Sequence, residues 1–230
     1  MRTELRGRTA VVTGAAGTMG RAMVAFLKED GLDVVGLDLT GDCTRCDVTD
    51  VAAVRRTIEN IGPVDVLVNN AGILSNHKAE ATSPDEWRRV LAANLDGAFY
   101  LARAVIPGMK ARRWGRIVNI CSLAAKTGGL TAGTAYAASK GGLASLTFSL
   151  ARELASFGVT VNAIAPAYVR TPMVTEQLSE AQRAALLAQI PVGRFCEAEE
   201  LAHVVRFLVS PLSGFITGEI VDVNGGLVMD

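Results

Sequence analysis

Apolar and polar positions follow two patterns along the chain: short apolar runs, and longer segments with a helical repeat. The runs that we predict as strands are Thr9–Thr13, Asp33–Leu37, Val64–Val68, Arg116–Ile120, Val159–Ile164 and Ile220–Val223, with a short strand near Cys43–Cys46. The segments that we predict as helices are Met19–Asp30, Val51–Ile61, Pro84–Arg112, Ala135–Phe157 and Glu197–Val209. Strands that alternate with helices favour βαβ units. The pattern therefore predicts an α/β fold with a parallel sheet.

One of the predicted helices has no polar face. Nearly every position in Ala135–Phe157 is apolar or small, and Leu91–Met109 is also apolar on more than one face. A helix without a polar side is buried on both sides. One side would cover the sheet and the other would meet a partner subunit, so we expect a homo-oligomer.

The length of the chain fits one domain. A chain of 230 residues lies within the size that one α/β domain reaches. No repeat, low-complexity tract or linker divides it, so we expect a single domain over residues 1–230. Pro172 and Pro191 bracket an Ala-rich stretch, and we expect residues 172–195 to form a mobile insertion beside the substrate.

Charge and composition exclude several classes of protein. The 23 Lys and Arg residues balance 23 Asp and Glu residues, so the chain lacks the basic character that marks nucleic-acid binding. No apolar run approaches the ~20 residues that a membrane span needs, and Met1–Arg8 lacks the apolar stretch of a signal peptide. We therefore expect a cytoplasmic protein that binds neither nucleic acid nor membrane. Cys43 and Cys46 have no second pair of ligands at matching spacing, so we expect no metal site.

A glycine-rich turn joins the first predicted strand to the first helix. It reads Thr13-Gly14-Ala15-Ala16-Gly17-Thr18-Met19-Gly20. Glycines at such a turn let phosphate oxygens approach the backbone amides, and the N-terminal end of the helix attracts a pyrophosphate. In this context the motif predicts a dinucleotide site. The candidate contacts are Gly14, Gly17, Thr18, Met19 and Gly20.

Asp38 ends the second predicted strand and indicates which dinucleotide binds. A carboxylate at this place can accept hydrogen bonds from the adenosine ribose hydroxyls, and it repels a 2′-phosphate. Leu39 and Thr40 follow, so no neighbouring Arg or Lys is available to hold that phosphate. We therefore expect NAD, with NADP less favoured. The alternative is an aspartate that only caps a turn.

Tyr136, Lys140 and Ser122 are candidate catalytic residues. Tyr136 and Lys140 are four positions apart in a predicted helix, which places both on one face. A tyrosine hydroxyl is a poor base at neutral pH, but a nearby ammonium group favours the phenolate, which can exchange a proton with a substrate oxygen. Ser122 follows the strand Arg116–Ile120, and ligands bind outside the carboxyl ends of strands in an open parallel sheet.

Over nearly its whole length the chain resembles the short-chain dehydrogenase/reductase family. The motifs come in the family's order: Thr13–Gly20, Asp47-Val48, Asn69-Asn70-Ala71-Gly72, Asn94, Ser122, Tyr136 with Lys140, Asn162 with Pro166, and Phe215-Ile216-Thr217-Gly218. The resemblance implies a Rossmann-type doubly wound parallel sheet of about seven strands, with helices on both faces, and a homotetramer. It also implies hydride transfer between a nicotinamide cofactor and an alcohol or ketone.

The resemblance assigns roles to single residues. Asn94 would kink its helix and position a water that relays protons to Lys140. Ser122 would orient the substrate oxygen, Tyr136 would be the acid/base, and Lys140 would also hold the nicotinamide ribose. Asn69 would steady the central strand. The further cofactor contacts that it implies are Asp47 and Val48 at the adenine, Asn70, Ala71 and Gly72 along the cofactor, Pro166, and Val169 and Thr171 at the nicotinamide carboxamide.

Three positions depart from the family's pattern. Thr18 stands where the family has its middle glycine, and Gly17 comes one place early, which puts the shape of the loop in doubt. Tyr136 follows Ser122 by 14 residues, one more than the family's spacing, and we expect an insertion around Gly128-Gly129 to absorb it. Ala167 replaces the usual glycine after Pro166.

Three functions remain open at this point. The first is an NAD-dependent dehydrogenase or reductase of secondary alcohols and ketones. The second is a 3-oxoacyl-thioester reductase, for which we expect NADPH and against which Asp38 argues. The third is a non-catalytic NAD-binding sensor, which would not need the proton-transfer residues. An uncharged or weakly polar substrate is favoured by the expected pocket residues, which are Ile73, Leu74, Leu123, Ala124, Met173, Val174 and Leu178. The histidines, His77 and His203, are not placed with Ser or Asp as a catalytic triad requires.

Overall fold

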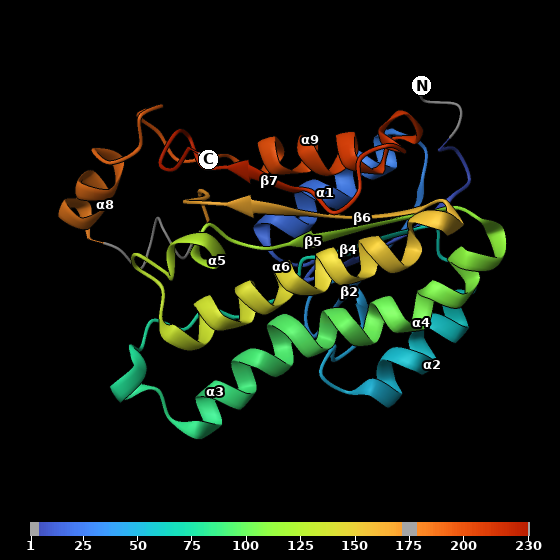
Figure 1. Ribbon diagram of the computed structural model, residues 1–230, viewed down its shortest axis with the longest axis horizontal. Coiled ribbons are helices and arrows are strands. Elements are labelled where there is room, and N and C mark those ends of the chain that lie inside the picture. The colour runs from blue at the N-terminus through green and yellow to red at the C-terminus, as the bar shows by residue number, and fades with distance from the viewer. Residues whose placement is uncertain (1–4, 172–178, 230) are drawn as a thin grey trace.

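Seven parallel strands form one sheet in the computed structural model, which describes residues 5–171 and 179–229. The strand order is β3-β2-β1-β4-β5-β6-β7 (Figure 1). The strands are β1 (Thr9–Thr13), β2 (Asp33–Asp38), β3 (Thr44–Arg45), β4 (Val66–Asn69), β5 (Gly115–Ile120), β6 (Val159–Pro166) and β7 (Ile220–Val223). The chain begins in the middle of the sheet, winds to one edge, and then returns to build the other. This is the predicted doubly wound Rossmann-type sheet.

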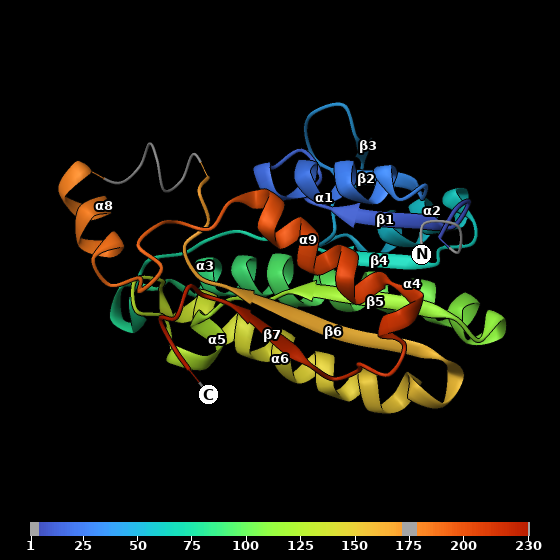
Figure 2. The same cartoon turned by 90° about the horizontal axis from the view of Figure 1, so that it is seen from above.

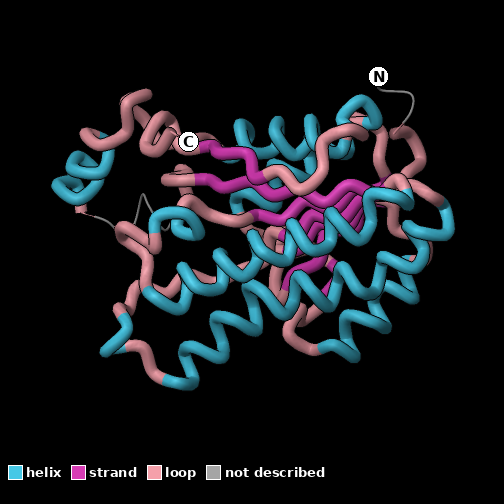
Figure 3. Tube along the Cα trace, in the orientation of Figure 1, coloured by secondary structure: helices cyan, strands magenta, loops and turns pink. Residues whose placement is uncertain are grey.

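Helices cover both faces of the sheet (Figures 1 and 3). On one face lie α1 (Thr18–Glu29) and α9 (Ala198–Val209), and on the other lie α2 (Val51–Ile61), α4 (Gly97–Arg112) and α6 (Thr134–Leu154). Figure 2 shows α1 and α9 crossing the sheet side by side. The smaller helical elements are η1 (Ala79–Ala81), α3 (Pro84–Leu91), η2 (Ala92–Asp96), α5 (Ala124–Thr127), η3 (Ala155–Phe157), α8 (Glu180–Leu187) and η4 (Pro211–Ser213).

The central strands are mainly apolar because each contributes to two cores. Val12 and Val118 pack into the core beneath α1 and α9, whereas their neighbours Val11 and Ile117 pack beneath α2, α4 and α6. Successive side chains of a strand point to opposite faces, so a sheet that is covered on both sides needs continuous apolar runs. This requirement explains why the strands show no alternation of apolar and polar residues.

A chain of buried polar side chains ties the central strands to α6. Asn69 on β4 donates to the Oδ1 of Asn119 on β5 at 2.9 Å, and Asn119 donates to the hydroxyl of Thr147 on α6 at 2.9 Å. All three residues are buried. Buried polar groups must be hydrogen-bonded, so these contacts fix the depth at which α6 lies against the sheet.

The long helix predicted over Pro84–Arg112 is interrupted at Asn94. It starts as predicted, with the Ser83 hydroxyl accepting a hydrogen bond from the Glu86 amide at 3.1 Å. After α3, however, the five residues of η2 form a π-helical turn before α4 continues. Extra residues of this kind are frequent at functional sites. At Asn94, where the resemblance implies a kink, the structure shows a change in helical winding.

The other boundaries differ from the predictions by a few residues. β4 begins at Val66 instead of Val64, and β6 continues to Pro166. Patterns of apolar residues did not indicate α5 or the 3₁₀ turns, which are too short for a helical repeat. α8 lies within the predicted insertion, of which residues 172–178 fall outside the described residues. In the described ranges no helix is both long and apolar enough to cross a bilayer.

Close packing between β1 and α1 leads to a first prediction. A Cβ atom on Gly20 would overlap the carbonyl oxygen of Gly14 and lie 2.7 Å from the Cα of Ala15. Because these are backbone atoms, we expect Gly20→Ala to lower the free energy of unfolding by about 1–3 kcal/mol, as overpacking does. Urea denaturation followed by circular dichroism measures this change. Gly141→Ala is the control, since no described atom lies within 4 Å of its added Cβ. An unchanged stability of Gly20→Ala would contradict this packing.

Candidate active site

The predicted site residues follow four neighbouring strands at their carboxyl ends. Gly14 follows β1, Asn70–Gly72 follows β4, Ser122 follows β5, and residues 167–171 follow β6. These strands are adjacent and parallel, so their ends meet at one edge of the sheet. The winding reverses between β1 and β4, which is the place where open α/β sheets bind their ligands.

Hydrogen bonds join the loop after β1 to the loop after β4. The Thr13 hydroxyl accepts hydrogen bonds from the Asn70 amide at 3.0 Å and the Ala71 amide at 2.9 Å. In return the Asn70 side chain donates to the carbonyl oxygens of Thr13 and Gly14, at 2.9 and 3.1 Å. Gly14 has a φ of +63°, which favours glycine. These hydrogen bonds thus hold the two loops together at the carboxyl edge of the sheet.

The glycine-rich loop fits the pyrophosphate of a dinucleotide. Gly17 precedes α1 and provides no side-chain cap, and the first turn of α1 contains no acidic residue. No side chain of this turn therefore neutralises the positive end of the helix dipole, which lies at the amides of Thr18, Met19 and Gly20 and can attract an anion. The Asn70 Oδ1 is buried without a hydrogen-bond partner among the described residues. These features fit a ligand that has both phosphates and hydrogen-bond donors.

At the end of the site where adenosine is expected, both carboxylate oxygens of Asp38 accept hydrogen bonds from backbone amides. Its Oδ2 accepts from the Ala16 amide at 3.0 Å, and its Oδ1 accepts from the amides of Leu39 and Thr40 at 2.7 and 3.2 Å. Arg45, the β3 partner of Asp38 in the sheet, donates to the Leu39 carbonyl at 2.7 Å. The carboxylate therefore has a capping function, and the Arg45 guanidinium is held at the carbonyl of the next residue, Leu39.

Asp47 and Val48 shape the turn that leads into α2. The Asp47 carboxylate accepts from the amide and the hydroxyl of Thr49, at 2.9 and 2.7 Å. A Cβ on Gly97 would lie only 2.8 Å from the Cγ2 of Val48, so α4 packs directly against this turn. Asp47 and Val48, which the resemblance places at the adenine, thus lie in a turn that leads into α2 and packs against α4.

Asn94 fixes the loop after β4. Its Oδ1 accepts from the Ile73 amide at 2.8 Å, and its Nδ2 donates to the Ile73 carbonyl and the Ser139 hydroxyl, both at 3.0 Å. A Cβ on Gly72 would lie 3.0 Å from this Oδ1 and 3.6 Å from the Nζ of Lys140. The structure therefore brings Gly72, Asn94 and Lys140 together.

Lys140 and Tyr136 lie on one face of α6. Lys140 is buried, with 4% of its surface exposed, and its Nζ donates to the Ile120 carbonyl at 2.7 Å. The same Nζ lies 5.7 Å from the centre of the Tyr136 ring. Tyr136 itself is half-buried. A buried ammonium group is costly unless it is hydrogen-bonded, and this one is directed to the end of β5 beside the tyrosine.

Ser122 lies at the start of α5, where its Oγ accepts from the Ala124 amide at 3.1 Å. The adjacent residue Leu123 donates its amide to the Pro166 carbonyl at 2.9 Å, which ties this loop to the end of β6. Gly128 and Gly129, where we expected the extra residue, have φ values of +73° and +84°. Two consecutive left-handed residues turn the chain from α5 toward α6.

The segment after β6 carries the remaining predicted contacts. Val169 forms an isolated bridge with Cys196, and the Arg170 amide donates to the Cys196 carbonyl at 2.8 Å. Thr171 is the last described residue before the gap. A cleft of about 610 Å³ opens here between α8 and residues 193–195. The predicted pocket residues Met173, Val174 and Leu178 lie outside the described residues.

The cysteines near the site are poor nucleophiles. Burial raises the pKa of the Cys121 thiol above its ordinary value, although Lys140 opposes the shift. Burial, followed by the negative charge of Glu200, raises the pKa of Cys196 to about 11. The thiolate is the reactive form, so both thiols are held in the unreactive form at neutral pH. No group of three or more metal-ligating residues occurs within residues 5–171 and 179–229.

Comparisons with known proteins agree with this geometry. A family model described as enoyl-(acyl carrier protein) reductase matches residues 14–228. The 3-oxoacyl-[acyl-carrier-protein] reductase FabG of Salmonella typhimurium is 42% identical over 98% of this chain and 99% of its own length. The FabG of Vibrio harveyi is 40% identical with the same coverage.

Solved structures agree with the fold. A putative NAD(P)-dependent gluconate 5-dehydrogenase from Beutenbergia cavernae, with NADP bound at low occupancy, superposes with a TM-score of 0.91 at 37% identity, covering 97% of both chains. The crystal structure of gox2181 superposes with a TM-score of 0.92 at 33% identity, covering 99% of both chains.

The expected preference for NAD over NADP is wrong. NADP is bound in the gluconate 5-dehydrogenase structure, and the relatives are named as 3-oxoacyl reductases, the alternative for which we expected NADPH. The physical reason lies in the turn after β2. The Asp38 carboxylate is occupied by three backbone amides, and Arg45, which pairs with Asp38 in the sheet, directs its guanidinium to the Leu39 carbonyl in the same turn. The sequence analysis considered only Leu39 and Thr40 as sources of positive charge.

Fold, motifs and relatives therefore lead to one conclusion. The family model and the relatives span almost the whole chain, and the loops at the carboxyl edge of the sheet bring Asn94, Tyr136 and Lys140 to one region. The chain belongs to the short-chain dehydrogenase/reductase family and is an oxidoreductase.

Proposed function

We propose that this protein reduces the keto group of a 3-oxoacyl thioester with NADPH. The observation that carries the proposal is the buried Lys140 ammonium beside the Tyr136 ring, at the edge of the sheet where the dinucleotide loop also lies. The thioester follows from the relatives, whose names specify 3-oxoacyl groups on a carrier protein.

Four side chains divide the work of the reaction. A bound nicotinamide cofactor supplies the hydride to the carbonyl carbon. Tyr136 donates its proton to the carbonyl oxygen as negative charge develops there, and the Lys140 cation stabilises the phenolate that remains. Ser122 holds the same oxygen by a hydrogen bond. Asn94 keeps the loop at Ile73 in place beside Lys140.

The substrate class can be tested directly. Acetoacetyl thioesters with NADPH are expected to be reduced, and the loss of reduced-cofactor absorbance measures the rate. Gluconate with NADP serves as the comparison substrate, because one structural relative is a putative gluconate 5-dehydrogenase. Faster turnover of gluconate than of the thioester would reject the proposed substrate.

Replacing Tyr136 by Phe removes the proton and keeps the ring. We expect Tyr136→Phe to lower kcat by roughly a hundredfold to ten-thousandfold, the contribution of general acid–base catalysis, while the Kd for NADPH stays within about twofold. Steady-state kinetics and fluorescence titration measure the two quantities. Tyr100→Phe is the matched control, because Tyr100 is a half-buried tyrosine on α4. If Tyr136→Phe retained most of its activity, another group would have to supply the proton.

Arg45 is expected to hold the 2′-phosphate of NADPH. Removal of one charge-assisted hydrogen bond weakens binding by about 1.5–3 kcal/mol, or roughly tenfold to a hundredfold. Arg45→Ala should therefore raise the KM for NADPH by that factor and leave the KM for NADH nearly unchanged. Arg55→Ala, which removes another exposed arginine, should change neither. A higher kcat/KM with NADH than with NADPH in the unmodified protein would refute the cofactor assignment.

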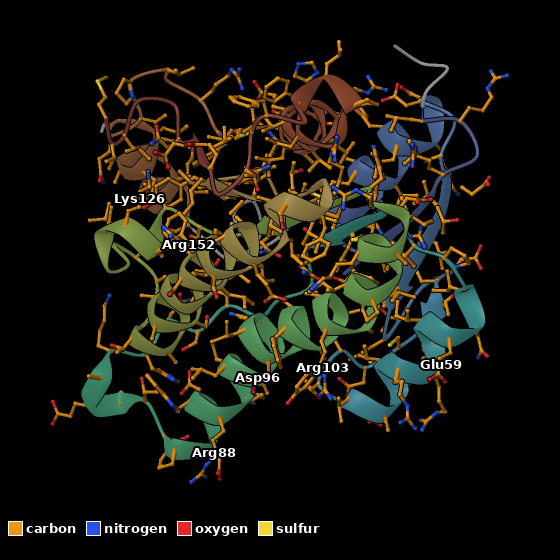
Figure 4. All side chains as sticks on the ribbon, turned by 45° about the vertical axis from the view of Figure 1, so that its right-hand side comes forward. Glu59, Arg88, Asp96, Arg103, Lys126 and Arg152 are labelled. Atoms are coloured by element: carbon orange, nitrogen blue, oxygen red, sulfur yellow. The ribbon has the colours of Figure 1, made fainter. Side chains whose placement is uncertain are left out.

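We also propose that a second copy of the chain covers the α4–α6 layer, as the apolar helices predict. Phe99 on α4 is 42% exposed and Phe148 on α6 is 52% exposed. Charges of both signs accompany them, with Asp96 and Arg103 on the η2–α4 segment and Arg152 on α6 (Figure 4). Apolar area with both signs of charge suits a self-complementary contact.

The assembly can be tested with a single charge. Phe148→Glu buries a carboxylate in the proposed contact, so we expect a lower mass by light scattering at micromolar concentration than for the unmodified protein. Phe207→Glu, on α9 at the opposite face of the sheet, should leave the mass unchanged, since Phe207 is also exposed, by 48%. A monomer mass for the unmodified protein would disprove the proposal.

A further inference from the structure

Glu86 on α3 uses both of its carboxylate oxygens on the loop after β4. The Ser75 hydroxyl donates to Oε1 at 2.6 Å, and the Nδ1 of His77 lies 2.8 Å from Oε2. Only 13% of the Glu86 side chain is exposed, whereas its neighbour Asp85 is 95% exposed. The hydrogen bond from Ser75, which has the larger effect, and the one from His77 lower the pKa of Glu86. The carboxylate therefore stays ionised at neutral pH and keeps accepting both contacts.

The same loop is hydrogen-bonded to the segment that begins α6. The Gly133 amide donates to the Ser75 carbonyl at 2.7 Å, and the Thr134 amide donates to the His77 carbonyl at 3.0 Å. A Cβ on Gly133 would overlap the His77 carbonyl oxygen. Lys78 adds a third contact, from its Nζ to the Ala132 carbonyl at 2.8 Å. Every one of these contacts lies within a few residues of Tyr136.

Glu86 has no comparable function within its own helix. It occupies the third position of α3, where a glutamate commonly returns a hydrogen bond to the capping residue. In α9 the corresponding pair, Glu197 and Glu200, makes this reciprocal contact. In α3 the Ser83 hydroxyl accepts from the Glu86 amide, while the Glu86 carboxylate points to the loop.

The three side chains do not form a catalytic triad. In a triad the serine hydroxyl is bonded to the histidine, and the acid orients that histidine. Here the Ser75 hydroxyl donates to Glu86, and Ser75 is buried, with 6% exposed. The arrangement is thus one carboxylate that holds two points of a loop.

We propose that Glu86 is a positioning residue for Tyr136. It fixes Ser75 and His77, whose carbonyl groups receive the amides of Gly133 and Thr134, and thereby sets the first turn of α6. The proposal rests on the reductase function proposed above, in which the Tyr136 hydroxyl meets the substrate oxygen. Small displacements of such a group are costly, since about 1 Å can reduce the rate by roughly a hundredfold.

The test compares two acidic residues in one helical turn. We expect Glu86→Ala to lower kcat by roughly tenfold to a hundredfold, with the Kd for NADPH unchanged, because Thr13 and Asn94 hold the cofactor end of this loop, residues 70–73, without Glu86. Asp85→Ala should leave both quantities unchanged. Glu86→Gln should recover most of the kcat, since its amide can accept from Ser75 and donate to an unprotonated His77. Ser75→Ala, which leaves Glu86 in place, should show a smaller loss than Glu86→Ala.

Hydrogen exchange provides a readout that is independent of activity. We expect faster deuterium uptake in residues 128–136 for Glu86→Ala than for Asp85→Ala, because the Gly133 and Thr134 amides lose a fixed acceptor. Support for the proposal requires both the faster exchange and the loss of kcat. Unchanged exchange overturns it, even if no substrate of the enzyme is found. Faster exchange with an unchanged kcat also overturns it, because the contact would then stabilise the loop without positioning Tyr136. If the kcat of Glu86→Gln were as low as that of Glu86→Ala, the proposal would likewise be overturned.

Discussion

The register between β1 and β4 is the constraint on which the site depends. Ala10 pairs with Val66 and Val12 pairs with Val68, and this alignment brings Thr13 level with the loop that begins at Asn70. A slip by one residue would turn every side chain of the strand to the other face. It would also move the Thr13 hydroxyl away from the Asn70 and Ala71 amides, which donate hydrogen bonds to it. The two apolar cores therefore determine where the dinucleotide loop meets the catalytic loop.

Local spacing explains which parts of the site could be predicted from the sequence. Tyr136 and Lys140 share a helical face because four residues separate them, and Gly14 needs a positive φ that glycine adopts readily. The strands were recognisable because a sheet covered on both faces is apolar throughout. A kink at Asn94 was implied by family resemblance, but the π-turn found there was not predicted, since no apolar repeat distinguishes it from an ordinary helix.

Contacts between distant segments explain what could not be predicted. Arg45 comes to the turn after β2 because β3 pairs with β2; the short strand was predicted, but its sequence does not tell which strand it pairs with. Glu86 follows Ser83 at the spacing of a capping box, so the sequence suggests a contact within α3. Its carboxylate instead contacts Ser75 and His77. Which partner a side chain bonds to depends here on packing between elements, and the local sequence does not determine that packing.

The π-turn of η2 constrains how this chain can change its length. A π-turn takes one residue more than an α-helical turn, so deleting one residue within η2 would return this segment to an ordinary α-helix and leave α4 in its present register with α3. Leu101 and Val105, which are buried, would stay against the sheet, whereas Asn94 would lose its place opposite Ile73. The loss of a single residue at η2 would therefore damage the candidate site and spare the core. The turn at Gly128 and Gly129, by contrast, can accommodate an extra residue without rotating any helix.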